Sequence, residues 1–113
     1  MRSSRLLAYA AAFAIALACG DATGPTTVDV AVQDDTFNPS ATTINVGSTI
    51  RWTWASANAN PHDLTWVDVG VPGQAAQNTG TYQRTFAIAG TFQYYCVIHG
   101  TPTTGMRGSV TVQ

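Results

Sequence analysis

The residues best suited to bind a metal ion form one pattern in this 113-residue chain. Both histidines belong to it, together with one of the two cysteines and one of the two methionines: His62, Cys96, His99 and Met106. One soft thiolate, two imidazoles and one thioether are the ligand set expected for a type 1 (blue) copper site, which transfers electrons. The pattern therefore predicts one copper ion bound by these four side chains.

Each predicted ligand has a chemical reason to be there. The Cys96 thiolate is soft, and the metal would remove its proton. His62 and His99 are neutral imidazoles that suit both oxidation states of copper, and Met106 would be a weak axial ligand that tunes the potential. Because no coordination position is left for a substrate, we expect an electron carrier and not an enzyme.

The N-terminus is predicted to be an export signal covering residues 1–18. Arg2 and Arg5 precede an apolar run of 13 residues, 6–18, which is too short for a comfortable membrane span. Cys19-Gly20 follows that run and resembles a bacterial lipobox, so we expect Cys19 to be lipidated; the alternative is a secreted protein with a free N-terminal thiol. Either product would lie in the periplasm or on the outer face of a bacterial membrane.

Residues 19–27 are expected to be a flexible tether, and residues 28–113 a single domain. A disulfide between Cys19 and Cys96 is not expected, because Cys96 has a better partner in copper. Downstream of the leader the chain has three arginines and six aspartates, a net charge of 3 − 6 = −3, with no lysine or glutamate. This balance does not resemble a basic nucleic-acid footprint.

Apolar residues alternate with polar ones from Val28 onward, which indicates strands. Seven to eight short strands with frequent turns and no amphipathic helix predict an all-β fold, an antiparallel Greek-key β-sandwich. Residues 70–80 look irregular, and 81–89 are expected to be a strand with Phe86 and Ile88 inward. Ile44 and Val46 are expected to share one face of an earlier strand.

Strand parity places the predicted ligands relative to the core. Cys96 shares its parity with Phe92 and Tyr94, and His62 shares its parity with Leu64 and Trp66, so both ligands should point into the sandwich.

Parity also separates the remaining candidates for a functional role. Tyr95 should point outward, as an electron exit or as an ordinary exposed aromatic residue. The tryptophans are expected to pack the core and Asp34-Asp35 to form a solvated turn.

The chain resembles the cupredoxins, specifically the plastocyanin-like small blue copper proteins. The resemblance rests on the segments 94–99, 105–112, 37–39, 44–52 and 60–63, and it covers nearly all of the chain from Val28. It implies a cupredoxin sandwich with one type 1 copper. Two departures stand out: six residues separate His99 from Met106, two more than in typical plastocyanins, and Asp63 stands where plastocyanins often carry asparagine.

The predicted function is single-electron transfer between exported or membrane redox proteins in transient complexes, by a monomer. A copper chaperone or storage protein is the alternative, although such proteins usually expose several Met or His residues. Nitrite reductases and multicopper oxidases need further histidines for a second copper centre. A copper-free adhesion domain would have no reason to keep all four ligands.

Overall fold

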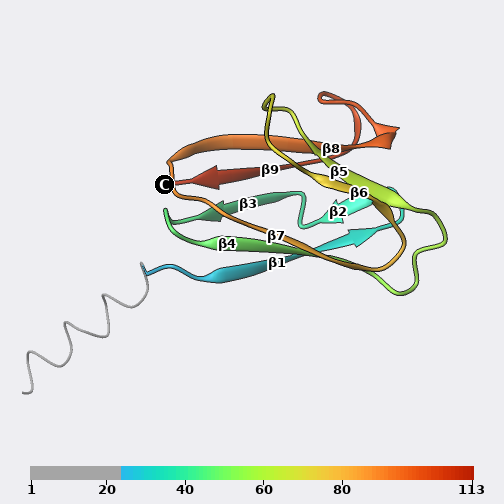
Figure 1. The fold of residues 1–113 in the computed structure, drawn as a ribbon, viewed down its shortest axis with the longest axis horizontal. Coiled ribbons are helices and arrows are strands. Elements are labelled where there is room, and N and C mark those ends of the chain that lie inside the picture. Colours follow the sequence, from blue (N-terminus) through green and yellow to red (C-terminus); the bar gives the residue numbers. More distant parts are fainter. Residues whose placement is uncertain (1–23) are drawn as a thin grey trace, which may run out of the picture.

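A computed structural model describes residues 24–113, so the predicted signal 1–18, Cys19 and the first part of the tether lie outside the described residues. The described part consists of nine strands (Figure 1). They are β1 (Thr27–Gln33), β2 (Thr36–Asn38), β3 (Ala41–Ile44), β4 (Thr49–Trp54), β5 (His62–Trp66), β6 (Gln74–Gln77), β7 (Gly80–Thr85), β8 (Gly90–Gly100) and β9 (Gly105–Val112).

The strands form two sheets that pack face to face. One has the order β2-β1-β4-β7 and the other β3-β9-β8-β5-β6. The predicted all-β Greek-key sandwich is confirmed. Two neighbouring pairs, β1 with β4 and β3 with β9, run parallel, and the other pairs are antiparallel.

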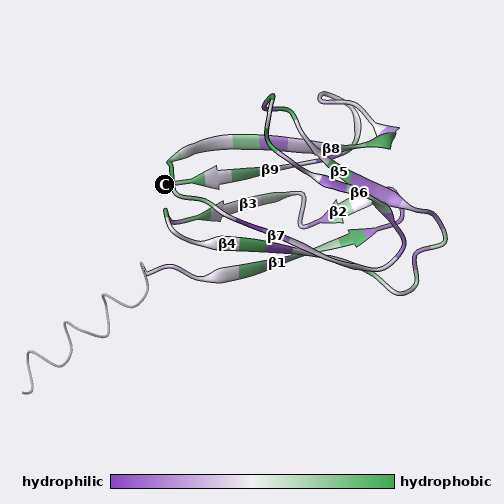
Figure 2. Ribbon diagram, in the orientation of Figure 1, coloured by the Kyte–Doolittle hydropathy of each residue, from purple (hydrophilic) through white to green (hydrophobic). Residues whose placement is uncertain are grey.

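The core forms because residues of one parity on each strand turn inward. In β4, Ile50, Trp52 and Trp54 are buried and Arg51 and Thr53 between them are exposed. Hydrophobic stretches are visible along β1, β4, β8 and β9 (Figure 2). The buried apolar residues are Val30, Val32, Phe37, Ile44, Ile50, Trp52, Trp54, Leu64, Trp66, Phe86, Tyr94, Cys96, Met106, Val110 and Val112.

Ile88 was expected inside the sandwich and lies outside it, and Val46 does not share the buried face of Ile44 as expected. Ile88 is 73% exposed and Val46 is 44% exposed. The strands end before them, at Thr85 and Ile44, and parity has no meaning beyond the last residue of a strand. Conversely, the stretch 70–80, expected to be irregular, contains the short strand β6.

Different strand ends meet at the two ends, or poles, of the sandwich. β1 and β4 end, and β5 begins, at one pole, where the N–H of Ala55 donates to the carbonyl of Val32 (2.9 Å). The opposite pole holds the start of β1 and the end of β9, and there the N–H of Val46 donates to the carbonyl of Gln113 (3.0 Å). Among residues 24–113 there is no helix that could cross a membrane.

Candidate metal centre

His62, Cys96 and His99 meet at the first pole. His62 opens β5, and the other two lie near the end of β8. Their ligand atoms lie within 4.8 Å of one another. The Nδ1 atoms of the two histidines are 3.1 Å apart, and Nδ1 of His99 is 3.6 Å from Sγ of Cys96. The two imidazoles therefore turn Nδ1 toward each other, and Nδ1 of His99 also lies beside the thiol.

These distances fit a single metal ion. Bonds of about 2.0 Å to nitrogen and about 2.3 Å to sulfur at tetrahedral angles space two nitrogens about 3.3 Å apart, and nitrogen and sulfur about 3.5 Å apart. The donor set of one thiolate and two imidazoles suits copper, and it would also accept zinc. The expected convergence of His62 with the Cys96 segment is thus present in the fold.

Cys96 is fully buried, as its parity predicted. Burial raises the pKa of its thiol, and the backbone N–H groups of Asp63, His99 and Ile98 act in the opposite direction. These N–H groups stabilise a thiolate in a place where water cannot. A bound cation would complete the deprotonation, because a coordinating thiol loses its proton outright.

Asp63 joins the strand that carries His62 to the strand that carries Cys96. Its Oδ1 accepts a hydrogen bond from the N–H of Val97 (2.8 Å), and its Oδ2 accepts one from the Thr65 hydroxyl (2.6 Å). The indole N–H of Trp54 donates to the carbonyl of His62 (2.8 Å). The backbone at His62 is therefore held by contacts that involve no metal ion.

The segment between His99 and Met106 is a closed turn. Gly100 pairs with Gly105 across the end of the β8–β9 hairpin. The N–H of Thr101 donates to the carbonyl of Thr104, and their hydroxyls are 2.8 Å apart. This closure brings the start of β9, with Met106, beside the end of β8, with His99.

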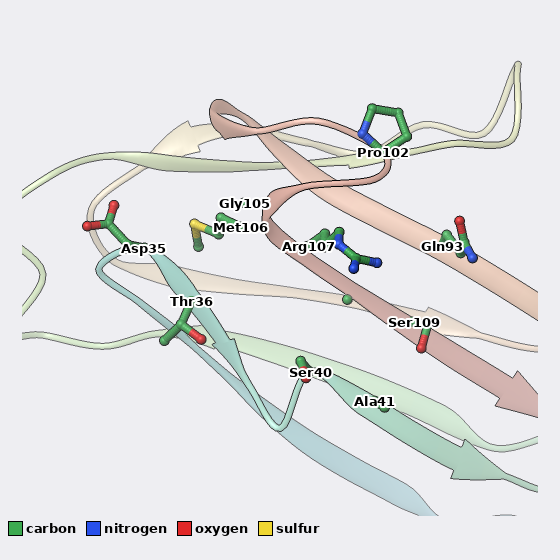
Figure 3. A pocket seen from close by; sticks show the side chains of 11 residues that line it. Asp35, Thr36, Ser40, Ala41, Gln93, Pro102, Gly105, Met106, Arg107 and Ser109 are labelled. Carbon is green, nitrogen blue, oxygen red and sulfur yellow. The ribbon is translucent and has the colours of Figure 1, made fainter.

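Met106 is buried at the start of β9. Met106 lines a groove together with Arg107 and Ser109, and Figure 3 shows it across from the turn that carries Asp35. The lining of that groove is mostly polar and includes neither histidine nor Cys96. The coordination of copper by Met106 remains a prediction.

Asp34 and Asp35 were expected to form only a solvated turn. In the structure their carboxylates also lie close to the two histidines of the candidate metal centre. Oδ1 of Asp34 lies 2.8 Å from Nε2 of His62, and Oδ1 of Asp35 lies 3.8 Å from Nε2 of His99. Asp34 is 28 residues from His62 in the chain. No local motif signals such a contact; only the shared pole of the sandwich brings them together.

Comparisons with known proteins agree with this geometry. Residues 26–113 match the family described as copper binding proteins, plastocyanin/azurin family. A plastocyanin from Scenedesmus fuscus is 32% identical over 88 residues, which cover 68% of this chain and 86% of the plastocyanin. Amicyanin from Paracoccus denitrificans is 38% identical over 76 residues, covering 62% of this chain and 53% of the amicyanin, about half its length.

Similar solved structures include a purple cupredoxin from Nitrosopumilus maritimus. Its TM-score is 0.61 at 26% identity, covering 76% of this chain and 99% of that one. A copper-containing nitrite reductase from Thermus scotoductus is similar with a TM-score of 0.56 at 26% identity over 80% of this chain, which amounts to 23% of the reductase. The chain belongs to the copper-binding plastocyanin/azurin family.

Proposed function

We propose that this chain carries single electrons through one type 1 copper ion held by His62, Cys96 and His99, with Met106 as a weak fourth ligand. The convergence of the two Nδ1 atoms and the Cys96 sulfur carries the proposal. When bound, copper supplies the redox chemistry by alternating between Cu(I) and Cu(II). The similarity to plastocyanin and amicyanin supports this function.

The protein contributes a ligand frame that does not depend on the oxidation state. His62 is fixed by the Trp54 indole and by the Asp63 link, and Cys96 lies on the long strand β8 inside the core. Outer hydrogen bonds of this kind orient the ligands and restrict their movement. Electron transfer is then fast because few atoms have to move when the charge of the ion changes.

His99 is the proposed entry and exit point for electrons. Its side chain is 24% exposed, whereas His62 and Cys96 are buried. Exposed Pro61, Thr101 and Pro102 surround this pole, and Val97 and Ile98 present apolar side chains from the adjacent part of β8. A small, mostly uncharged surface suits the weak and short-lived complexes of redox partners.

We also propose that the chain is exported through residues 1–18 and held to a bacterial membrane by lipid on Cys19. β1 starts at Thr27 at the pole opposite the copper site and runs seven residues toward it, a span of roughly 23 Å. An anchor before Thr27 would therefore join the domain at the pole opposite His99 and leave the His99 surface free for partners. The mass of the mature N-terminal peptide, with or without attached acyl chains, tests this proposal.

Visible absorption of the copper-loaded protein tests the electron-carrier proposal. We expect an intense thiolate-to-Cu(II) band at one copper per chain, abolished by Cys96→Ser and retained by Cys19→Ser as the matched control. The band should bleach with one electron per copper in a reductive titration. A colourless oxidised protein, as expected for a chaperone, a storage protein or a zinc site, would refute the proposal.

A further inference from the structure

The buried ligand His62 has a carboxylate on the side away from the metal site. Nδ1 of His62 lies 3.1 Å from Nδ1 of His99, and Nε2 lies 2.8 Å from Oδ1 of Asp34. His62 is fully buried, whereas the Asp34 side chain is 35% exposed. Asp34 is thus placed where it can act on the copper through His62 without touching the ion.

Asp34 is held in place by the backbone of the loop that precedes β5. Its Oδ2 accepts a hydrogen bond from the N–H of Ala59 (2.9 Å), and its Oδ1 accepts one from the N–H of Asn60 (3.2 Å). The Asn58 amide reinforces the arrangement by donating to the carbonyl of Val32 (2.9 Å). The end of β1 is therefore fastened to the loop that delivers His62.

The 2.8 Å contact identifies which nitrogen of His62 carries a proton. Both carboxylate oxygens of Asp34 accept backbone N–H groups, so the carboxylate acts as an acceptor and Nε2 of His62 donates to it. Nδ1 then keeps its lone pair and points it toward the site that it shares with His99 and Cys96.

We propose that Asp34 is a positioning residue that selects the metal-binding tautomer of His62 and favours the oxidised state of the copper. A carboxylate bonded to the far nitrogen of a ligating histidine fixes the ring and makes it a more basic donor. A more basic donor and a nearby negative charge both stabilise Cu(II) more than Cu(I). This inference rests on the proposed copper function and concerns one residue that the ligand pattern does not contain.

Asp35 provides a natural contrast within the same turn. It is 70% exposed, and its Oδ1 is 3.8 Å from Nε2 of His99, beyond hydrogen-bond distance. Its backbone is left-handed at φ 64°, a conformation that asparagine tolerates. Asp35→Asn therefore removes the same charge from the same turn without removing a ligand hydrogen bond. Exposed Asp68, beyond the far end of β5, gives a distant charge control.

The experiment measures the reduction potential and the Cu(II) affinity of four variants: Asp34→Asn, Asp34→Ala, Asp35→Asn and Asp68→Asn. Both Asp34 variants should keep the blue band and bind Cu(II) about tenfold to 100-fold more weakly. The affinity for Cu(I) should fall less than the affinity for Cu(II). Each tenfold difference between these two losses of affinity raises the reduction potential by about 59 mV. The two control variants should stay close to the wild type.

A second measurement follows the tautomer in the metal-free protein. Nitrogen-15 spectra at one fixed pH should show the proton of His62 on Nε2 in the wild type and distributed over both nitrogens in Asp34→Ala. A purely structural role would lower stability without moving the tautomer or the potential. If Asp34→Ala does not fold, the reduction potential of Asp34→Asn tests the proposal. Its amide oxygen can still accept the hydrogen bond from His62, but the negative charge is gone.

The outcomes separate the two proposals. A wild-type protein that forms no blue copper site refutes the electron-carrier function. A blue wild type whose potential is unchanged in Asp34→Asn refutes the role of Asp34 alone. An equal shift in Asp35→Asn would also overturn it, because charge on the turn and not the bond to His62 would then set the potential.

Discussion

Two neighbouring residues and one distant residue converge at this candidate metal centre. Cys96 and His99 lie close together on β8, and His62 comes from a strand that starts more than thirty residues before Cys96. Residues outside this group contact two of its members: backbone N–H groups, including those of Asp63 and Ile98, act on the Cys96 sulfur, and Asp34 and Trp54 bond to His62. We therefore expect the redox properties of the proposed copper site to depend on residues that do not touch the ion.

Met106→Leu tests the fourth ligand at the residue scale. Leucine has nearly the volume of methionine, so the buried position should stay packed and the blue band should remain. Loss of the weak thioether donor should favour Cu(I) and raise the potential, by about 59 mV if the preference changes tenfold. Spectroelectrochemical titration measures this shift, and an unchanged midpoint would remove Met106 from the coordination sphere.

At the scale of elements, the β8–β9 hairpin brings His99 and Met106 to the same pole. Its end is narrow because two glycine backbones pass each other closely. A Cβ on Gly105 would lie 2.6 Å from the carbonyl oxygen of His99, and one on Gly100 would lie 2.6 Å from the amide nitrogen of Met106. The hairpin can close over the extra residues only because both positions lack a side chain.

Gly105→Ala tests this close approach. Gly105 has a φ of 76°, so alanine there should cost about 1–2 kcal/mol for the left-handed backbone alone. The contact with the His99 carbonyl adds to that cost and pushes His99 out of place, so copper affinity should fall as well. Chemical denaturation and chelator competition measure the two effects.

Gly70→Ala is the matched control for the hairpin variant. Gly70 has a similar φ of 86°, but a Cβ there would meet nothing within 4 Å. We expect only the backbone cost and an unaltered copper affinity. Equal losses of stability in the two variants, with copper binding intact in both, would show that the hairpin end is not sterically tight.

On the scale of the whole molecule, an aromatic core connects the two sheets beneath the metal site. The Tyr94 ring meets Phe37, Trp52 and Trp66 edge to face at centroid distances of 4.8, 5.3 and 5.3 Å. A Cβ on Gly108 would lie 2.4 Å from the Tyr94 ring, so this glycine makes room for it. Among the described residues, the Tyr94 hydroxyl has no hydrogen-bond partner.

Burial of Tyr94 should make the fold sensitive to alkaline pH. Burial raises the pKa of Tyr94 to about 12; the nearby Trp52 indole lowers it by less, although the two groups do not reach hydrogen-bond geometry. The unfolded chain, with a tyrosine pKa of about 10, then binds fewer protons than the folded one between pH 10 and 12, so stability falls as pH rises through that window. The total loss should be about 3 kcal/mol.

Tyr94→Phe should remove this part of the pH dependence. It should leave stability at pH 7 unchanged or slightly higher, because a buried hydroxyl without a partner disappears. Tyr95→Phe, on the opposite face of the same strand, is the control that should keep the decline. Unfolding curves from pH 8 to 12 measure the free energy of unfolding of each variant. An identical decline of this free energy in the wild type and in Tyr94→Phe would contradict the prediction.

The amino-acid sequence alone determined the kinds of ligand, their order and the strand character of the chain. Cys96 and His62 are buried as their parity predicted, because alternation is a local property of an extended backbone. The same rule failed for Ile88 and Val46, where the strand had already ended, since strand ends depend on pairing with other strands.

Only the tertiary structure decided which distant residues share a pole. The Asp34–His62 hydrogen bond, the link from Asp63 to Val97 and the closure of Gly100 on Gly105 all join segments through space. No periodicity encodes such contacts, because they follow from how two sheets stack and where their strands stop. The sequence alone thus indicates which residues would bind the metal. The packed sandwich decides which other residues surround them.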